Sequence, residues 1–158
     1  MSMLKLVRTD STNPDFQGLI QKLDAELHAR YGLQQEDYDR LNALDRAKAL
    51  IGYINEMPVA CGCFKLHAGQ TAELKRMFVD RDHRQKGYST LVLKNLEAWC
   101  TALGINTMIL ETGVRQPEAI GLYRKCGYTI IANFGPYADN DNSVCMRKTL
   151  DSSPASKR

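Results

Sequence analysis

The segment Arg84–Thr90 has the residue types and spacing of an anion-binding turn. It follows a predicted strand at 72–79 and begins a predicted helix. A helix N-terminus attracts anions because its first N–H groups have no partner within the helix and carry partial positive charge. Gly87 lets the backbone approach a ligand closely, while Arg84 and Lys86 add full positive charges. The segment therefore predicts a site for pyrophosphate or a similar anion, and a glycine turn with solvated basic residues is the alternative.

Other ligand chemistries fit the sequence less well. Gly87-Tyr88-Ser89-Thr90 lacks the glycine spacing and the lysine of a Walker A loop, and the chain has no G-x-G-x-x-G segment. The five cysteines include no CxxC pair and no Cys/His cluster with zinc spacing. We therefore expect no metal site and interpret the cysteines as reduced, mostly buried thiols. His28, His67 and His83 are isolated in the sequence, and we expect them in a helix, a turn and a loop, respectively.

Hydrophobic periodicity places these residues on an ordered series of strands and helices. Strands are expected at 3–8, 47–54, 59–66, 72–79, 107–111, 128–132 and 143–149. Helices are expected to begin at Pro14, Gly87 and Pro117 and to end at Gly32, Gly104 and Gly127. The polar stretch 34–42 is expected to form a short helix or an ordered loop. A meander followed by strand–helix–strand predicts an α/β (α+β) fold with a mixed sheet and helices on its faces.

Size and composition are those of one globular domain. The chain has 158 residues, of which 44% are hydrophobic and 25% charged. We expect a single domain at 1–150 and a disordered polar tail at 151–158. The net charge of +3 is not concentrated in a basic block, which argues against nucleic acid as a partner. No apolar run has the length of a membrane span or of a signal peptide, so a cytoplasmic location without a membrane partner is expected.

Two motifs resemble those of the GNAT superfamily of N-acetyltransferases. Arg84-x-x-Gly87-x-Ser89 resembles the R/Q-x-x-G-x-G/A signature that binds the pyrophosphate of coenzyme A. The segment Gln116–Tyr128 is similar to a second motif of that family, in which a helix carrying A-x-x-L-Y ends at G-F/Y. The resemblance covers about 47–150. Ser89 replaces the usual Gly or Ala, and Gln116 stands where the family often has Asn.

The resemblance implies both a fold and a co-substrate. The fold is a mixed, mostly antiparallel sheet of six to seven strands with helices on both faces. Its two central parallel strands, here 72–79 and 107–111, splay apart and hold the pantetheine arm. The co-substrate is acetyl-CoA. The implied cofactor-binding residues are Met77, Phe78, Val79, Arg84, Gln85, Lys86, Gly87, Tyr88, Ser89, Thr90, Gln116, Ala119 and Tyr123.

Acetyl transfer to an amine also needs acid–base groups. An alkylamine with a pKa of about 10 is almost fully protonated at neutral pH, so a base has to remove a proton. Glu73 and Glu111, one on each implied central strand, are the candidate bases, and family bases often lie on the strand of Glu73. A solvated carboxylate at Glu73 and hydrogen bonds from loop amides to Glu111 are the structural alternatives. Tyr123 matches the family tyrosine that protonates the leaving thiolate; a core tyrosine is the alternative.

The predicted function is transfer of the acetyl group of acetyl-CoA to a primary amine of a small molecule, by direct attack in a ternary complex. Tyr31, Tyr38 and Tyr137 are candidates for lining the amine pocket. An amine of a protein is the alternative acceptor. A non-catalytic acyl-CoA-binding sensor and a nucleotide-binding α/β domain are the rival functions. Either a monomer or a homodimer is compatible with the sequence.

Overall fold

The computed structural model describes residues 3–31 and 46–150. The expectations for Gly32 as a helix end, for a short helix or loop at 34–42, and for a disordered tail at 151–158 lie outside the described residues. So do Tyr38 and the side chain of Tyr31. Within the described residues, no helix is long and apolar enough to cross a membrane.

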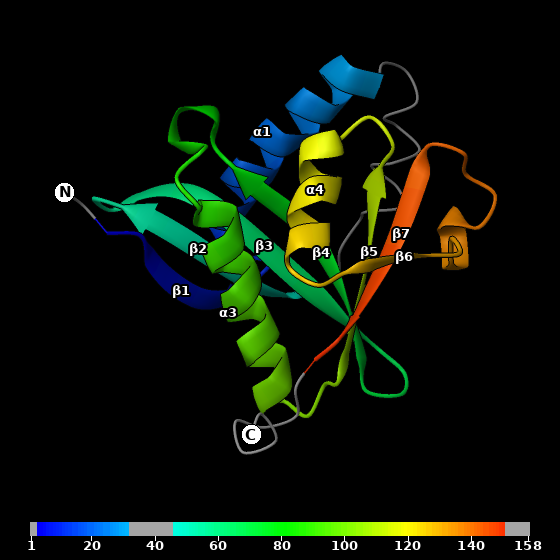
Figure 1. The fold of residues 1–158 in the computed structure, drawn as a ribbon. Helices are drawn as coiled ribbons and strands as arrows, with labels where there is room; N and C mark the ends of the chain where they lie inside the picture. The colour runs from blue at the N-terminus through cyan, green and yellow to red at the C-terminus, as the bar shows by residue number, and fades with distance from the viewer. Residues whose placement is uncertain (1–2, 32–45, 151–158) are drawn as a thin grey trace. The chain divides into compact units, whose positions relative to one another are not determined.

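Seven strands form one mixed sheet in the order β1-β2-β3-β4-β5-β7-β6 (Figure 1). The pairings β1–β2, β2–β3, β5–β7 and β6–β7 are antiparallel, whereas β4 and β5 are parallel. Paired residues of β4 and β5 run from Thr71 and Thr107 to Leu74 and Leu110. The strands are β1 (Lys5–Asp10), β2 (Lys48–Ile54), β3 (Met57–His67), β4 (Thr71–Val79), β5 (Thr107–Gly113), β6 (Thr129–Ile131) and β7 (Ser143–Thr149).

Three α-helices and two short 3₁₀ turns accompany the strands. The helices are α1 (Pro14–Tyr31), α3 (Tyr88–Ala102) and α4 (Pro117–Lys125), and the turns are η2 (Arg81–His83) and η3 (Gly135–Tyr137). The described chain divides into two compact units. The N-terminal unit comprises the described residues of Met1–Phe64 together with Lys75–Leu96, and the C-terminal unit comprises Lys65–Leu74 together with the described residues of Glu97–Arg158.

In the N-terminal unit, helices cover both faces of β3. Phe16 and Leu19 of α1 belong to one buried cluster with Cys61 and Cys63, which point to the same side of β3. A Cβ atom built on Gly62, which lies between these cysteines, would be 2.8 Å from Leu96 Cδ1 of α3. The opposite face of the strand therefore packs against α3, and the expected helix on each face is present.

The C-terminal unit is built around β5 and β7. Their antiparallel register runs from Thr107 opposite Thr149 to Gly113 opposite Ser143. Met108, Leu110 and Met146 are almost completely buried in it. All five cysteines of the chain are buried and free of disulfide bonds, as expected.

Most element positions agree with the sequence prediction, with shifts at the ends. The first strand begins and ends two residues later than expected and reaches Asp10, whose side chain accepts a hydrogen bond from Thr12 N–H at 2.9 Å. The hairpin turn is shorter than expected, because Asn55 and Glu56 both have positive φ (49° and 67°), as a two-residue turn requires. Consequently β3 begins at Met57 instead of Val59.

Candidate active site

The segment between β4 and α3 is held in place by two residues of α1. Lys22 Nζ lies 3.0 Å from Asp80 Oδ2, and Asp80 Oδ1 accepts a hydrogen bond from Arg81 N–H at the start of η2. Four residues further along α1, Glu26 accepts two hydrogen bonds from Arg84, at 2.7 and 2.9 Å. Lys22 and Glu26 share one face of the helix because they are one turn apart. The N-terminal unit thus fixes both ends of the turn that leads to Gly87.

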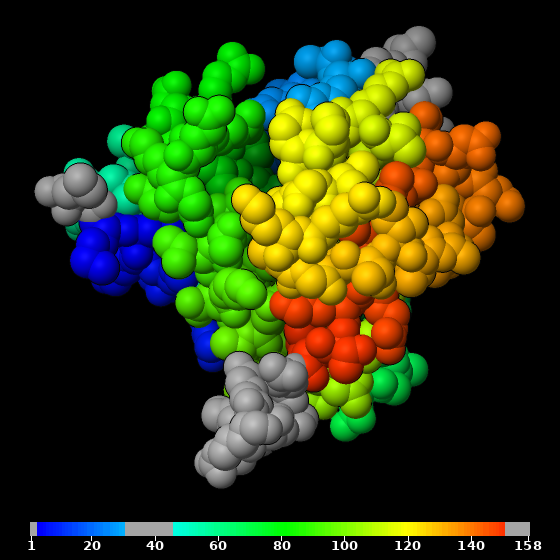
Figure 2. Space-filling model, in the orientation of Figure 1, coloured from blue at the N-terminus to red at the C-terminus, as the bar shows by residue number. Residues whose placement is uncertain are grey.

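The helix N-terminus has the geometry expected of an anion site. The first hydrogen bond of α3 runs from Leu91 N–H to Gly87 C=O at 3.2 Å, so the N–H groups of the first helical turn have no intrahelical acceptor. Gln85 and Gly87 have positive φ (63° and 81°), which turns the backbone sharply before the helix begins. This segment is at the protein surface, in the green part of Figure 2. The arrangement suits a phosphate group.

Arg84, the first residue of the expected signature, bonds within the protein. Its Nε donates to the carbonyl oxygen of Val79 at 2.7 Å, and its guanidinium also lies 5.5 Å from the centre of the Phe78 ring. The carboxylate of Glu26 offsets its charge. The remaining positive charge of the signature is on Lys86, which is exposed. Tyr88, Ser89 and Thr90, which form the first turn of α3, are half-buried.

The end of β4 carries the three residues expected beside the pantetheine arm. Arg76 has φ of 60°, an uncommon value for a residue other than glycine, and it interrupts the regular strand conformation. Its guanidinium donates to Asp24 of α1 at 2.7 Å. Phe78 joins the buried cluster beneath α1, whereas Met77 lies on the opposite face, its Sδ 2.6 Å from the place of a Cβ on Gly62. Val79 is buried.

In the C-terminal unit, Glu73 and Glu111 lie on the same face of the sheet. Glu73 is in register with Ile109, and Glu111 follows Ile109 by two residues, so the three side chains point to one side. Glu111 accepts a hydrogen bond from Ser143 Oγ at 2.6 Å. This hydroxyl partner comes from β7. Both candidate bases are brought to one region of this unit.

Glu73 is buried and hydrogen-bonded through both carboxylate oxygens. His67 Nε2 lies 2.9 Å from Oε1, and Tyr137 Oη donates to Oε2 at 3.2 Å. A solvated Glu73 at a strand start is thereby excluded. The expectation that His67 lies in a turn is wrong, because His67 is the last residue of β3, where its ring is a partner of Glu73. Its chemistry was missed since the spacing of six residues matches no catalytic motif.

Tyr137 lies close to both carboxylates. Burial, the negative charges of Glu73 and Glu111, and the hydrogen bond donated to Glu73 all raise the pKa of its phenol far above the ordinary value. The ring is almost completely buried and packs edge-on against Phe134 at 5.6 Å. Tyr137, a candidate for the amine pocket, is therefore a hydrogen-bond donor to the candidate base.

The C-terminal end of α4 positions Tyr123. Gly127 has φ of 99°, and its N–H bonds to the carbonyl of Arg124, while Tyr128 N–H bonds to the carbonyl of Tyr123 at 2.9 Å. This pair of bonds is a Schellman motif, which requires a left-handed residue after the helix. It also stacks the rings of Tyr128 and Tyr123 edge-on, 5.7 Å apart. The helix end at Gly127 therefore fixes the backbone that carries both tyrosine rings.

The phenol of Tyr123 is buried and protonated. Burial is the main cause of a pKa well above the ordinary value, and Cys126 and Glu111 raise it further. The other two residues expected from this motif lie at the opposite end of α4. Gln116 precedes Pro117 and makes no side-chain capping hydrogen bond with the described residues, and Ala119 is half-buried.

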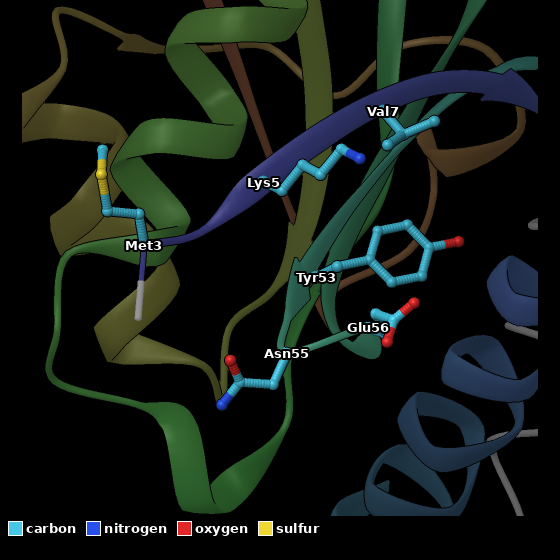
Figure 3. A pocket seen from close by; sticks show the side chains of 6 residues that line it. All are labelled: Met3, Lys5, Val7, Tyr53, Asn55 and Glu56. Atoms are coloured by element: carbon cyan, nitrogen blue, oxygen red, sulfur yellow. The ribbon is translucent and has the colours of Figure 1, made fainter. Parts of the chain in front are cut away.

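A surface hollow of about 560 Å³ lies elsewhere in the N-terminal unit, beside β1 and the β2–β3 turn (Figure 3). Its lining contains none of the predicted site residues; it consists of Met3, Lys5, Val7, Tyr53, Asn55 and Glu56. The hydroxyl of Tyr53 donates to Asp15 of α1 at 2.7 Å. Since neither the candidate bases Glu73 and Glu111 nor Tyr123 lines the hollow, we do not assign the hollow to the candidate active site.

Comparison with known proteins identifies the family. The profile of the Acetyltransferase (GNAT) family matches residues 12–128. The IAA acetyltransferase of Azospirillum brasilense is 33% identical over 135 residues, which cover 84% of this chain and 88% of that protein.

Solved structures agree with this assignment. A proposed acyl-CoA N-acyltransferase from Klebsiella pneumoniae has a TM-score of 0.80 and 31% identity, with 94% of this chain and 99% of that chain covered. A Bacillus subtilis acetyltransferase crystallised with CoA shares the fold, with a TM-score of 0.68, 15% identity and coverage of 94% and 100%. The chain thus belongs to the acetyltransferase (GNAT) family and is an acetyl-CoA-dependent N-acetyltransferase.

Proposed function

We propose that the acceptor is a primary amine of a small molecule and that it attacks acetyl-CoA directly in a ternary complex, with Glu73 as the base. The observation that carries this proposal is the placement of Glu73 and Glu111 on one face of the C-terminal unit. Two carboxylates attract an ammonium substrate, and a carboxylate is the group that can take its proton. Glu73 is favoured over Glu111 because it is the more deeply buried of the two.

The pyrophosphate of the co-substrate is assigned to the start of α3. The N–H groups of Tyr88, Ser89 and Thr90 supply hydrogen bonds, and Lys86 supplies charge. The turn at Gln85 and Gly87 allows close approach of the backbone. By family resemblance, the backbone of Met77, Phe78 and Val79 follows the pantetheine arm, and Gln116 and Ala119 lie beside it.

Tyr123 is assigned to the leaving thiolate. A thiol has a pKa of about 8.5, whereas the pKa of Tyr123 lies above the ordinary phenol value of about 10. Full proton transfer from this phenol to a thiolate is therefore unfavourable. A hydrogen bond donated to the sulfur as negative charge develops lowers the barrier without that transfer.

Three features support the wider assignment. The family profile runs through residues of both compact units, which supports a single acetyltransferase domain at 1–150. The free, buried cysteines support a reducing compartment such as the cytoplasm. Glu73 has a hydrogen-bond partner at each carboxylate oxygen, His67 at one and Tyr137 at the other. This buried, oriented carboxylate supports an enzyme over a non-catalytic acyl-CoA sensor, because a sensor needs no base.

The test is thiol release from acetyl-CoA, measured with amino acids, polyamines, aminoglycosides and short peptides as acceptors. IAA is included because the Azospirillum brasilense relative is called an IAA acetyltransferase. We expect release with one class of small amines. We expect Tyr123→Phe to lower kcat by about 10- to 100-fold with little change in KM for the amine. Release with peptides alone would replace the small-molecule acceptor by a protein amine. Binding of acetyl-CoA without release, and indifference to Tyr123→Phe, would support a sensor instead.

A further inference from the structure

His67 joins a buried carboxylate to the protein surface. The side chain of Glu73 is 7% exposed and that of His67 is 38% exposed, and their nearest atoms, Oε1 and Nε2, are 2.9 Å apart. A buried base that accepts a proton at every turnover needs a route by which the proton leaves, because an uncharged Glu73 cannot act again. Building on the proposed function, we propose that His67 is this route and relays the proton from Glu73 to solvent.

The proton balance of the relay is simple. The ammonium group of the acceptor loses one proton to Glu73, directly or through water, and the free amine forms the new N–C bond as the C–S bond breaks. The second proton that the nitrogen loses on becoming an amide passes to the thiolate, so coenzyme A leaves as the free thiol. With the ring in its Nδ1–H tautomer, the protonated Glu73 then donates its proton to Nε2 of His67, while Nδ1 releases its own proton to water. Glu73 becomes a carboxylate again, and rotation or proton exchange restores the starting tautomer of the ring.

The surroundings of the pair support a relay rather than a fixed charge. Tyr137 Oη donates to the second oxygen of Glu73 and holds the carboxylate in place while the first oxygen faces His67. Titratable groups that interact within this cluster include Glu111 of β5, Tyr137 of η3 and Cys145 of β7. Since the pKa values of Tyr137 and Cys145 are raised by burial, these two stay protonated at neutral pH. Histidine is the side chain whose charge changes most readily near neutral pH, which suits a proton carrier.

Two substitutions separate a relay from a positioning role. In His67→Gln the side-chain amide can still donate a hydrogen bond to Glu73 but carries no exchangeable acid–base function. In His67→Ala both are lost and space is left for a small imidazole molecule. His28→Gln, in α1 of the other unit, is the matched control because His28 is exposed and takes no part in the candidate site.

The experiment measures kcat with a working amine at low buffer concentration and during titration with imidazole. A relay predicts a loss of about 10-fold or more in both His67 variants, recovery of His67→Ala with imidazole, and no effect of imidazole on the wild type or on His28→Gln. Wild-type activity in His67→Gln would refute the relay, and so would a wild-type enzyme stimulated by imidazole as strongly as His67→Ala. Thermal unfolding of each variant shows whether it is folded, and a lack of amine-dependent release in the wild type would overturn the proposed function instead.

Discussion

Arg84 is expected to support acetyl-CoA binding by holding the turn before α3, and its exchange for Met tests this. The guanidinium bonds to Glu26 and to the carbonyl of Val79, so its Nε and Nη2 donors are engaged before any ligand binds. The pair with Glu26 is partly exposed, at 40% and 32%, and such pairs contribute about 0.2–1 kcal/mol. The charge-assisted bond to Val79 adds about 1–2 kcal/mol.

These magnitudes convert into binding constants. Arg84→Met removes both contacts, so we expect the Kd for CoA to rise by about 8- to 150-fold, which corresponds to about 1.2–3 kcal/mol. Glu26→Gln removes only the ion pair, and we expect a rise of about 2- to 3-fold. Adding Glu26→Gln to Arg84→Met should cost nothing further, because the two residues act as one unit. Isothermal titration calorimetry with CoA gives all four values.

The direction in which Glu26→Gln changes the Kd for CoA distinguishes two roles of Arg84. If Arg84 instead binds the pyrophosphate directly, Glu26 competes with the ligand, and Glu26→Gln will tighten CoA binding. That result would refute the holding role. Lys86→Gln is the comparison variant: Lys86 is exposed, so we expect its effect of about 2- to 5-fold at low salt to shrink as salt screens the charge.

Two further predictions concern the stability of the N-terminal unit. Gly62→Ala places a Cβ 2.6 Å from Met77 Sδ and should lower the free energy of unfolding by about 1–3 kcal/mol. At Gly18 of α1, a Cβ would meet nothing within 4 Å beyond the adjacent residues and the backbone of the same helix, so Gly18→Ala should raise the free energy of unfolding by about 0.5–1 kcal/mol. Urea unfolding measures both values, and equal stability of the two variants would contradict the packing argument. Burial and the hydrogen bond donated to Asp15 raise the pKa of Tyr53 to about 12. Because the unfolded phenol ionises at about 10, this stabilisation is present below pH 10 and disappears as the pH rises towards 12. Tyr53→Phe should therefore lower the free energy of unfolding by about 0.5–1 kcal/mol at pH 8, a small value because the hydrogen bond between Tyr53 and Asp15 is exposed. In the same urea assay, the difference between this variant and the wild type should vanish at high pH.

The sequence predicted the elements where local chemistry determines them. Gly127 marked the end of α4 because only a residue that tolerates positive φ can close a Schellman motif, and the helix does end there. The alternation on β3 predicted that Cys61 and Cys63 share a face, and both belong to the cluster beneath α1. The parallel pair β4–β5 was predicted as well, from the family resemblance.

Long-range pairing could not be predicted in the same way. Arg84 has the charge that an anion site needs, but its partner Glu26 lies 58 residues earlier in the chain, and nothing in either local sequence indicates the contact. Tyr137 is 64 residues from Glu73 and comes from a 3₁₀ turn after a loop, where hydrophobic periodicity gives no orientation. The positive φ of Arg76 is a property of the strand in its tertiary setting and has no sequence signal of its own.

His67 is a different case, because physical reasoning can find it. A carboxylate on a buried strand is costly unless it is hydrogen-bonded, so a partner for Glu73 has to exist within reach. β3 ends at His67 and β4 begins at Thr71, so a connection of only three residues brings these two strand ends close together. Glu73 is two residues into β4 from Thr71 and points to the same side, within the reach of a long side chain at the end of β3. The demand for a partner and the geometry of the hairpin together select His67, whereas neither does so alone.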